Sequence, residues 1–284
     1  MPCLLVLTWV ALLIAPGLAQ SPQGRRVPPT PFTAGIMAKA DYHVHIKGDL
    51  TLGEALRRSR ESGITYGVVI NGGRNFPIND DAGLEAWLKD MTGTPAFLAF
   101  QAEGREWTGV FSKRTLEKFD YVFTDSMTWS DDTGKRMRLW MPDEVGTIAD
   151  PQRFMDMLVA RATTIFNAEP IDIYVNPTFV PAQLQADYEK LWTPVRMKAI
   201  VEGLAKNGIA MEINNRYRIP SAAFITLARQ SGVKFACGTN NTSSADLGRN
   251  EYCAEMIRVC ELKPADFWTP PAEGRKAVQR RPLR

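Results

Sequence analysis

Histidine is almost absent from this chain: its 284 residues include only His43 and His45, one residue apart. This scarcity excludes a site that draws histidines from several distant segments. The run from Asp41 to Lys47 alternates like a β-strand, in which side chains two positions apart share a face. Neutral imidazole is the commonest protein ligand for transition metals, so the pair predicts a metal-binding position. The alternative is two ordinary polar residues at the edge of a strand.

Cysteine is also scarce, with four residues in the chain. If Cys3 is removed with a signal peptide, the other three give no disulfide framework, because one must stay unpaired. Cys253 and Cys260 lie seven positions apart on a predicted helix, about 10 Å along its axis, which is too far for a disulfide. We therefore expect buried free thiols, with a disulfide from Cys237 to one of the other two as the alternative.

Long hydrophobic runs are absent beyond the first 19 residues. An uncharged apolar run extends from Leu4 to Ile14, and small residues follow it up to Ala19. This pattern predicts a secretory signal peptide over residues 1–19, and hence a secreted or periplasmic protein. A membrane anchor is the alternative, but the run is short for a bilayer span and is interrupted by Pro16 and Gly17. We expect no stable membrane insertion after cleavage.

A strong charge of one sign is missing too, since the formal net charge is +3. The excess lies in residues 269–284, where five basic residues stand against Glu273 alone. Nothing elsewhere resembles the basic face of a nucleic-acid-binding protein, so the expected partner is a small molecule and not a nucleic acid. We predict a basic disordered tail over residues 269–284 and a proline-rich linker over residues 20–40.

No Gly-x-Gly-x-x-Gly run opens a helix, which argues against a dinucleotide-binding open sheet. Residues 41–268 instead alternate between short apolar segments and amphipathic helices. Strands are predicted near residues 42–46, 66–71, 95–103, 120–124, 171–176, 209–214 and 233–239, with an irregular section from 125 to 150. Such alternation predicts parallel βαβ units. The sequence therefore predicts one α/β domain, a barrel of seven such units.

Polar side chains follow almost every predicted strand. In α/β barrels the chemistry lies at the carboxyl ends of the strands, so these residues are expected to meet at one mouth. They are carboxylates, carboxamides and arginines: Arg74, Glu103, Arg105, Asp125, Asn176, Glu212, Asn214, Arg216, Asn240 and Asn241. The alternative is that loops are polar simply because they are exposed.

The predicted metal site combines His43 and His45 with the carboxylate of Glu103. Two imidazoles and one charged oxygen suit a single divalent ion, such as zinc, manganese or iron, that keeps positions open for water or substrate. Glu103 could equally be a structural partner of Arg105 or Arg216.

The other strand-end residues divide by chemistry. Asp125 or Glu212 is the candidate general base, and Arg105 or Arg216 is the candidate for binding substrate charge. Substrate binding is predicted for a further arginine and four amides: Arg74, Asn176, Asn214, Asn240 and Asn241.

The opening Asp41-Tyr42-His43-Val44-His45 resembles the Asp-x-His-x-His motif of the PHP (polymerase and histidinol phosphatase) superfamily. Glu103 is similar to that family's third-strand glutamate, and Ala210-Met211-Glu212-Ile213-Asn214 resembles its sixth-strand Leu-Glu-Ile-Asn segment. The resemblance spans Ala40 to Cys260. It implies a distorted (β/α)7 TIM-like barrel, two or three divalent metals, and cleavage of phosphoesters by a metal-activated water.

The later motifs of that family contain histidines that this chain lacks. The corresponding places read Asn71-Gly72, Asp125-Ser126-Met127, Asn176-Pro177 and Asn240-Asn241. A centre of three metals cannot be built from these side chains, so at most one metal is expected.

Two functions follow. The first is an exported metal-dependent hydrolase that acts on a small polar or anionic substrate, phosphorylated or sugar-like, through one metal-activated water. The second is a catalytically inactive barrel that binds a carbohydrate-like ligand through its asparagines, its arginines and the rings of Trp107, Trp129 and Trp140. A metal-dependent isomerase or lyase is a third possibility, because a barrel does not determine the reaction.

Overall fold

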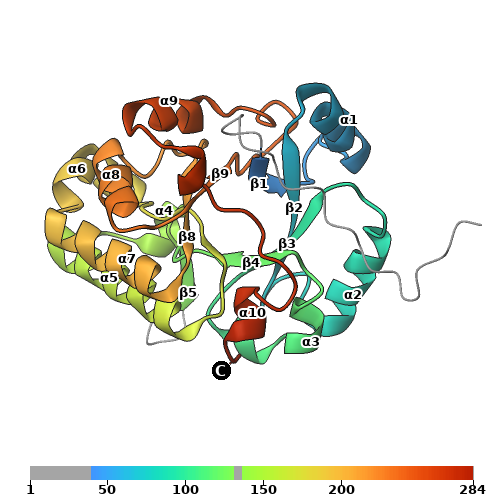
Figure 1. Ribbon diagram of the computed structural model, residues 1–284. Coiled ribbons are helices and arrows are strands. Elements are labelled where there is room, and N and C mark those ends of the chain that lie inside the picture. The colour runs from blue at the N-terminus through green and yellow to red at the C-terminus, as the bar shows by residue number, and fades with distance from the viewer. Residues whose placement is uncertain (1–39, 131–135, 284) are drawn as a thin grey trace, which may run out of the picture.

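The fold is a barrel of short parallel strands surrounded by helices (Figure 1). The computed structural model describes residues 40–130 and 136–283. Within these residues, the main sheet is built from β1 (Ala40–His45), β2 (Thr65–Gly72), β3 (Phe97–Ala102), β4 (Tyr121–Thr124), β7 (Ile173–Tyr174), β8 (Ala210–Asn214) and β9 (Phe235–Gly238).

The strands follow the order β1-β2-β3-β4-β7-β8-β9, and each neighbouring pair is parallel. The two edge strands meet where the Asn240 N–H donates to the His43 carbonyl at 2.9 Å. Asp41 strengthens this closure, because its carboxylate accepts from the backbone N–H of Thr239 at 2.9 Å and from the Thr239 hydroxyl. The barrel is therefore nearly closed, and the predicted seven-stranded TIM-like architecture is confirmed.

Apolar clusters inside and outside the strands support the barrel. Its interior is filled by side chains that alternate along the strands: Tyr42, Val69, Phe97, Ala99, Tyr121, Phe123, Ile173, Val175, Ala210 and Ala236. Trp268 covers the amino ends of the strands, since its ring packs edge-on against the rings of Tyr42 at 5.2 Å and Tyr121 at 5.3 Å. The larger core lies between the strands and the helices. This packing leaves the carboxyl ends of the strands as the polar mouth.

Helices follow the strands along the chain, and Figure 1 shows α5 to α8 on one side and α1 to α3 on the other. Their bounds are α1 (Leu52–Ser62), α2 (Asp81–Asp90), α3 (Lys113–Leu116), α5 (Pro151–Ala168), α6 (Tyr188–Leu191), α7 (Pro194–Asn207), α8 (Ala222–Gln230) and α9 (Glu251–Val259). Short 3-10 turns are η1 (Glu106–Gly109), η2 (Ala182–Asp187) and η3 (Pro264–Asp266). None of the described helices has the length and apolarity needed to cross a membrane.

Local sequence sets the helix ends. The Thr51 hydroxyl accepts from the Glu54 N–H at the start of α1, and Gly63 ends that helix with φ of 66°. Pro194 begins α7, because a proline needs no amide hydrogen in the first turn. Because of this start, α7 is a separate helix from α6, which ends at Leu191.

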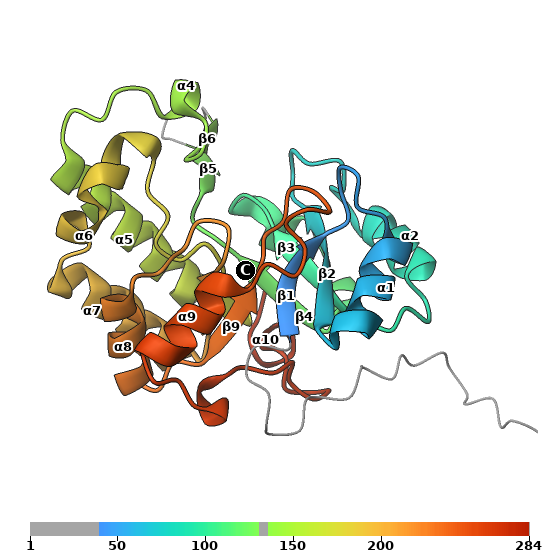
Figure 2. The ribbon, with the colours of Figure 1, turned by 90° about the horizontal axis from the view of Figure 1, so that it is seen from above.

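The section from 125 to 150 contains more structure than the sequence predicted. The strands β5 (Thr128–Ser130) and β6 (Arg136–Arg138) pair antiparallel, and α4 (Pro142–Val145) follows them. Figure 2 shows this hairpin and α4 at one edge of the molecule, away from the barrel strands. Strands this short leave little periodicity in the sequence by which they could be recognised.

The carboxyl-terminal stretch packs against the barrel and ends in α10 (Ala277–Arg280). Ala277 and Val278 are buried, and Lys276 donates to the Glu117 carbonyl at 2.6 Å. The prediction of a disordered tail is therefore wrong for residues 269–283, because these apolar side chains find a place beside α3 and β4. The predicted signal peptide and nearly all of the predicted linker lie outside the described residues.

The cysteine prediction is corrected as well. Cys237 on β9 and Cys253 on α9 form a disulfide, and Cys260 is buried and unpaired. The expectation of three free thiols failed because α9 packs back on the strand that precedes it. The pairing from Cys237 that was the alternative is the one observed.

Candidate functional site at the barrel mouth

His43 and Glu212 form the central pair of the mouth. Nδ1 of His43 lies 2.7 Å from Oε1 of Glu212, and both side chains are buried. A carboxylate at this distance accepts the Nδ1 hydrogen, so a neutral ring carries its lone pair on Nε2. That Nε2 is buried and has no hydrogen-bond partner among the described residues. Histidines that bind metals are commonly oriented by a carboxylate in this way.

Three asparagines connect Glu212 to the rest of the mouth. The Asn176 backbone N–H donates to Oε2 of Glu212 at 2.7 Å, and Asn214 Nδ2 donates to the same oxygen at 2.9 Å. Oδ1 of Asn176 accepts from the side-chain amides of Asn214 at 2.9 Å and Asn240 at 3.0 Å. Nδ2 of Asn176 donates to Asp125 at 2.9 Å. The structure thus brings residues from the ends of β4, β7, β8 and β9 into one network.

The backbone around this network is crowded. A Cβ atom at Gly238 would lie 2.1 Å from Oε1 of Glu212 and 2.8 Å from Cβ of His43, so only glycine fits there. Asn176 and Asn240 have φ angles of 48° and 49°, in the left-handed region that asparagine tolerates better than most residues. Asparagine thus suits both the backbone and the hydrogen bonds at these two positions.

Glu103 and Asp125 form an acidic pair in the mouth. Glu103 accepts from Nδ2 of Asn71 at 2.7 Å, and Asp125 accepts from the Met127 N–H at 2.8 Å. Burial, together with the neighbouring Asp125 carboxylate, raises the pKa of Glu103 to about 8. Burial also raises the pKa of Asp125. A cation bound here would stabilise the charged form of both carboxylates.

His45 lies beside His43, with the ring centroids 5.0 Å apart. Burial, followed by the nearby His43, Lys47 and Arg216, lowers the pKa of His45 well below its ordinary value. Its imidazole is therefore neutral at neutral pH. Asn241, which was predicted to bind substrate, holds the backbone of this strand: it accepts from the His45 N–H at 2.7 Å and donates to the His45 carbonyl at 2.8 Å.

The predicted arginines do not converge on this network. Arg105 donates to Glu169 and to Thr124, each at 2.8 Å, which are structural contacts. Arg74 is exposed and lines a small cavity with Glu103. Arg216 is exposed, and its guanidinium lies 5.0 Å from the centroid of the Tyr217 ring. Substrate binding by these arginines stays a prediction.

The structure does not assemble His43, His45 and Glu103 into a metal cluster. Within residues 40–130 and 136–283, no three His, Cys, Asp or Glu side chains form a group that could hold an ion. The donor chemistry nevertheless suits one cation, because the mouth offers an unpartnered imidazole nitrogen, a second neutral imidazole and two buried carboxylates. The predicted set of ligands therefore stays a prediction.

Two residues of the mouth were missed as site residues. Asp41 joins the first strand to the last, and Asn71 holds the Glu103 carboxylate. Asp41 belongs to the opening motif, and Asn71 belongs to the polar strand ends. The positional signal that identified the other residues could therefore have found both.

Two solved structures, of a histidinol phosphatase and of a putative one, share the fold of this chain. The Lactococcus lactis enzyme HisK, in complex with zinc, L-histidinol and phosphate, has a TM-score of 0.56 and 10% identity over 85% of this chain and 98% of its own. The putative HisK of Listeria monocytogenes has a TM-score of 0.54 and 10% identity over 75% of this chain and 99% of its own. The chain has the fold of these phosphatases. The shared fold confirms the barrel architecture that the resemblance to the PHP superfamily implied.

Sequence comparison adds no relative, because no family model and no curated protein matches the chain. At 10% identity the two phosphatases share the fold, and the chemistry must be argued from the residues of this mouth.

Proposed function

We propose that this protein is an exported metal-dependent hydrolase that acts on a phosphorylated substrate through one divalent cation. The observation that carries the proposal is the buried Nε2 of His43, which has no hydrogen-bond partner within residues 40–130 and 136–283, while Glu212 orients its ring. A buried polar atom without a hydrogen-bond partner lowers the stability of the folded protein. Such an atom in a polar mouth therefore indicates that a ligand binds there. The phosphatases of the same fold, one of them with zinc and phosphate, support this class of reaction.

The cation would be held by two imidazole nitrogens and one carboxylate oxygen from the ends of β1 and β3, those of His43, His45 and Glu103. A divalent cation in such a site lowers the pKa of a bound water and polarises the phosphoryl group.

The two predicted general bases differ in what they already bind. Glu212 accepts three hydrogen bonds, from His43, the Asn176 backbone and Asn214, so we assign it to orienting His43. Asp125 accepts one bond on each of its oxygens and keeps acceptor capacity. Asp125 is therefore the residue that we propose takes the proton from the attacking water.

The activity is tested with p-nitrophenyl phosphate and the purified mature chain. Hydrolysis is expected to stop when EDTA is added and to return with zinc or manganese. His43→Asn keeps an amide that can donate to Glu212 but lacks Nε2, so it is expected to lower kcat/KM by about a hundredfold while the fold is retained. Arg114→Gln, a charge removal at an exposed position of α3, is the control with unchanged activity.

Hydrolysis that persists after chelation, or in His43→Asn, contradicts the proposal. If no metal supports hydrolysis by the wild-type protein, the barrel that binds a ligand without catalysis takes its place.

Export is supported by the apolar run from Leu4 to Ile14 and by the disulfide between Cys237 and Cys253. Disulfides persist mainly in oxidising compartments, whereas cytosolic thiols are kept reduced. We expect the mature protein, recovered from the periplasm or the medium, to begin at Gln20. A cytoplasmic protein that still carries Met1–Ala19 contradicts export.

A further inference from the structure

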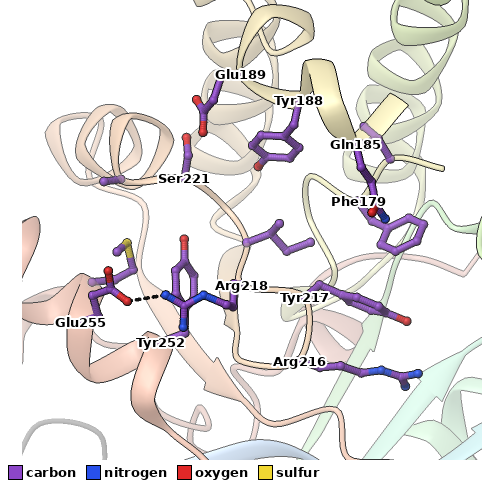
Figure 3. A pocket seen from close by; sticks show the side chains of 14 residues that line it. Phe179, Gln185, Tyr188, Glu189, Arg216, Tyr217, Arg218, Ser221, Tyr252 and Glu255 are labelled. Carbon is purple, nitrogen blue, oxygen red and sulfur yellow. Dashed lines mark hydrogen bonds and ion pairs between the residues drawn. The ribbon is translucent and has the colours of Figure 1, made fainter. Parts of the chain in front are cut away.

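A cleft of about 600 Å³ lies beside the mouth, and no part of the proposed reaction uses it. Its volume falls within the range of small-molecule binding sites. Its walls come from η2 and α6, the β8–α8 loop and α9 (Figure 3). Four aromatic rings line it: Phe179, Tyr188, Tyr217 and Tyr252.

Contacts within the protein hold these rings in place. The Tyr188 hydroxyl lies 2.5 Å from the Thr178 hydroxyl, and the Tyr252 hydroxyl donates to a backbone carbonyl at 2.6 Å. Phe179 and Tyr217 pack edge to face with their centroids 4.8 Å apart. Figure 3 shows this pair on one side of the cleft and Tyr252 on the other. A preformed cleft loses little conformational entropy when a ligand binds.

Positive charge borders the same cleft. Arg218 is neutralised by Glu255 at 2.6 Å. Arg216, in contrast, forms no salt bridge among the described residues: its guanidinium contacts the Tyr217 ring, and the Asp246 carboxylate acts on it only over a longer distance. Arg216 also lines a second cavity of about 400 Å³ that reaches Thr239, the residue before Asn240 of the mouth. Of the two arginines that line the cleft, Arg216 is therefore the one without a salt bridge in the described chain, and it lies on the side of the cleft next to the mouth.

We propose that this cleft binds an anionic carbohydrate, with the sugar ring against Phe179 and Tyr217 and the negative group on Arg216. A sugar has an apolar C–H face that suits an aromatic ring and hydroxyls that need polar partners. Polar side chains that could serve these hydroxyls line the cleft: Gln185, Glu189 and Ser221. The planar guanidinium of Arg216 suits a phosphate or a carboxylate.

An anionic carbohydrate is then the substrate class of the proposed function. Its hydrolysis rests on that function, whereas its binding to the cleft does not. Binding is therefore measured directly, by calorimetric titration of the mature protein with glucose 6-phosphate, glucose and inorganic phosphate. Glucose 6-phosphate is expected to bind at least about tenfold more tightly than either of the other two, because only it contacts both the rings and Arg216.

Substitutions test the aromatic rings and Arg216 separately. Tyr217→Ala is expected to weaken glucose 6-phosphate binding about tenfold and to leave phosphate binding within about twofold, whereas Tyr217→Phe keeps the ring and binds like the wild type. Phe179→Ala is the second ring variant, should Tyr217→Ala fail to fold. Arg216→Gln is expected to weaken glucose 6-phosphate but not glucose, with Arg114→Gln as the control.

Phenyl phosphate distinguishes a sugar from an aromatic ligand. If it binds more tightly than glucose 6-phosphate and depends equally on Tyr217, the assignment to a carbohydrate is overturned. If glucose 6-phosphate does not bind, or binds unchanged to both ring variants, the cleft is not its site. If binding follows the prediction but no hydrolysis occurs, only the proposed function fails.

Discussion

Within the mouth, the hydrogen bonds that a carboxylate already accepts determine whether it can act as a general base. Glu212 was a candidate general base from its position at a strand end, but three donors occupy it and one of them is the ring of His43. Alternation along a strand predicts which side chains enter the mouth. It does not predict which of them pair, because pairing between β1 and β8 depends on how the barrel closes.

Arg105 illustrates the same limit for a charged residue. It lies just beyond the end of β3, as the sequence predicted, but its guanidinium binds Glu169, which comes from the end of α5. That partner is 64 positions away in the chain, and no local pattern links the two. The sequence could therefore place the arginine near the mouth but could not determine its contacts.

At the scale of helices and strands, the alternation of apolar segments and helices predicted the order of the barrel. The predicted strand bounds were less accurate than the order. The strand β7 covers only Ile173–Tyr174, whereas a strand was predicted from Ile171 to Asn176. The residues on either side of β7 are buried, and the backbone N–H groups of Asp172 and Val175 still donate to β4 carbonyls at 2.7 and 3.0 Å. The packed tail and the disulfide depend on tertiary contacts, which composition and periodicity do not contain.

Asp172 links three of these elements and makes stability depend on pH. Its two oxygens accept from the backbone N–H groups of Val122 at 3.0 Å, at the start of β4, and of Ala277 at 2.8 Å, in α10. Burial raises its pKa from 3.8 to about 6 in the folded protein. The folded state therefore holds this proton more tightly than the unfolded chain does, so the contribution of Asp172 to stability is full below pH 4 and is lost as the pH rises to 6.

We predict that Asp172→Asn removes this dependence. The shift corresponds to about 3 kcal/mol between the two limits, so the difference in free energy of unfolding between wild type and variant should change by up to that amount from pH 4 to 7. Urea denaturation at several pH values measures it, with Asp187→Asn, at an exposed position, as the control. A difference that stays constant across this range shows that Asp172 does not titrate as described.

For the whole molecule, the contacts that close the barrel also assemble the site. Asp41, Asn240 and Asn241 connect the first and last strands through contacts that also position His43 and His45. Trp268 covers the opposite end, so in the described part of the chain the mouth is the polar end of the barrel interior. The sequence predicted this opening because strand ends of a parallel barrel converge. The adjoining aromatic cleft was not predicted, because its rings come from α6, α9 and two loops.

The central claim is that Glu212 orients His43 so that Nε2 binds a divalent cation. The most direct test is the zinc content of the dialysed mature protein, measured by elemental analysis and followed by competition titration with a chelator. We predict one zinc per wild-type chain, and an affinity 10- to 100-fold lower in both His43→Asn and Glu212→Gln. Two results would contradict the account. One is a wild-type protein that retains no metal after loading with zinc or manganese, and the other is a zinc affinity of both variants equal to that of the wild type.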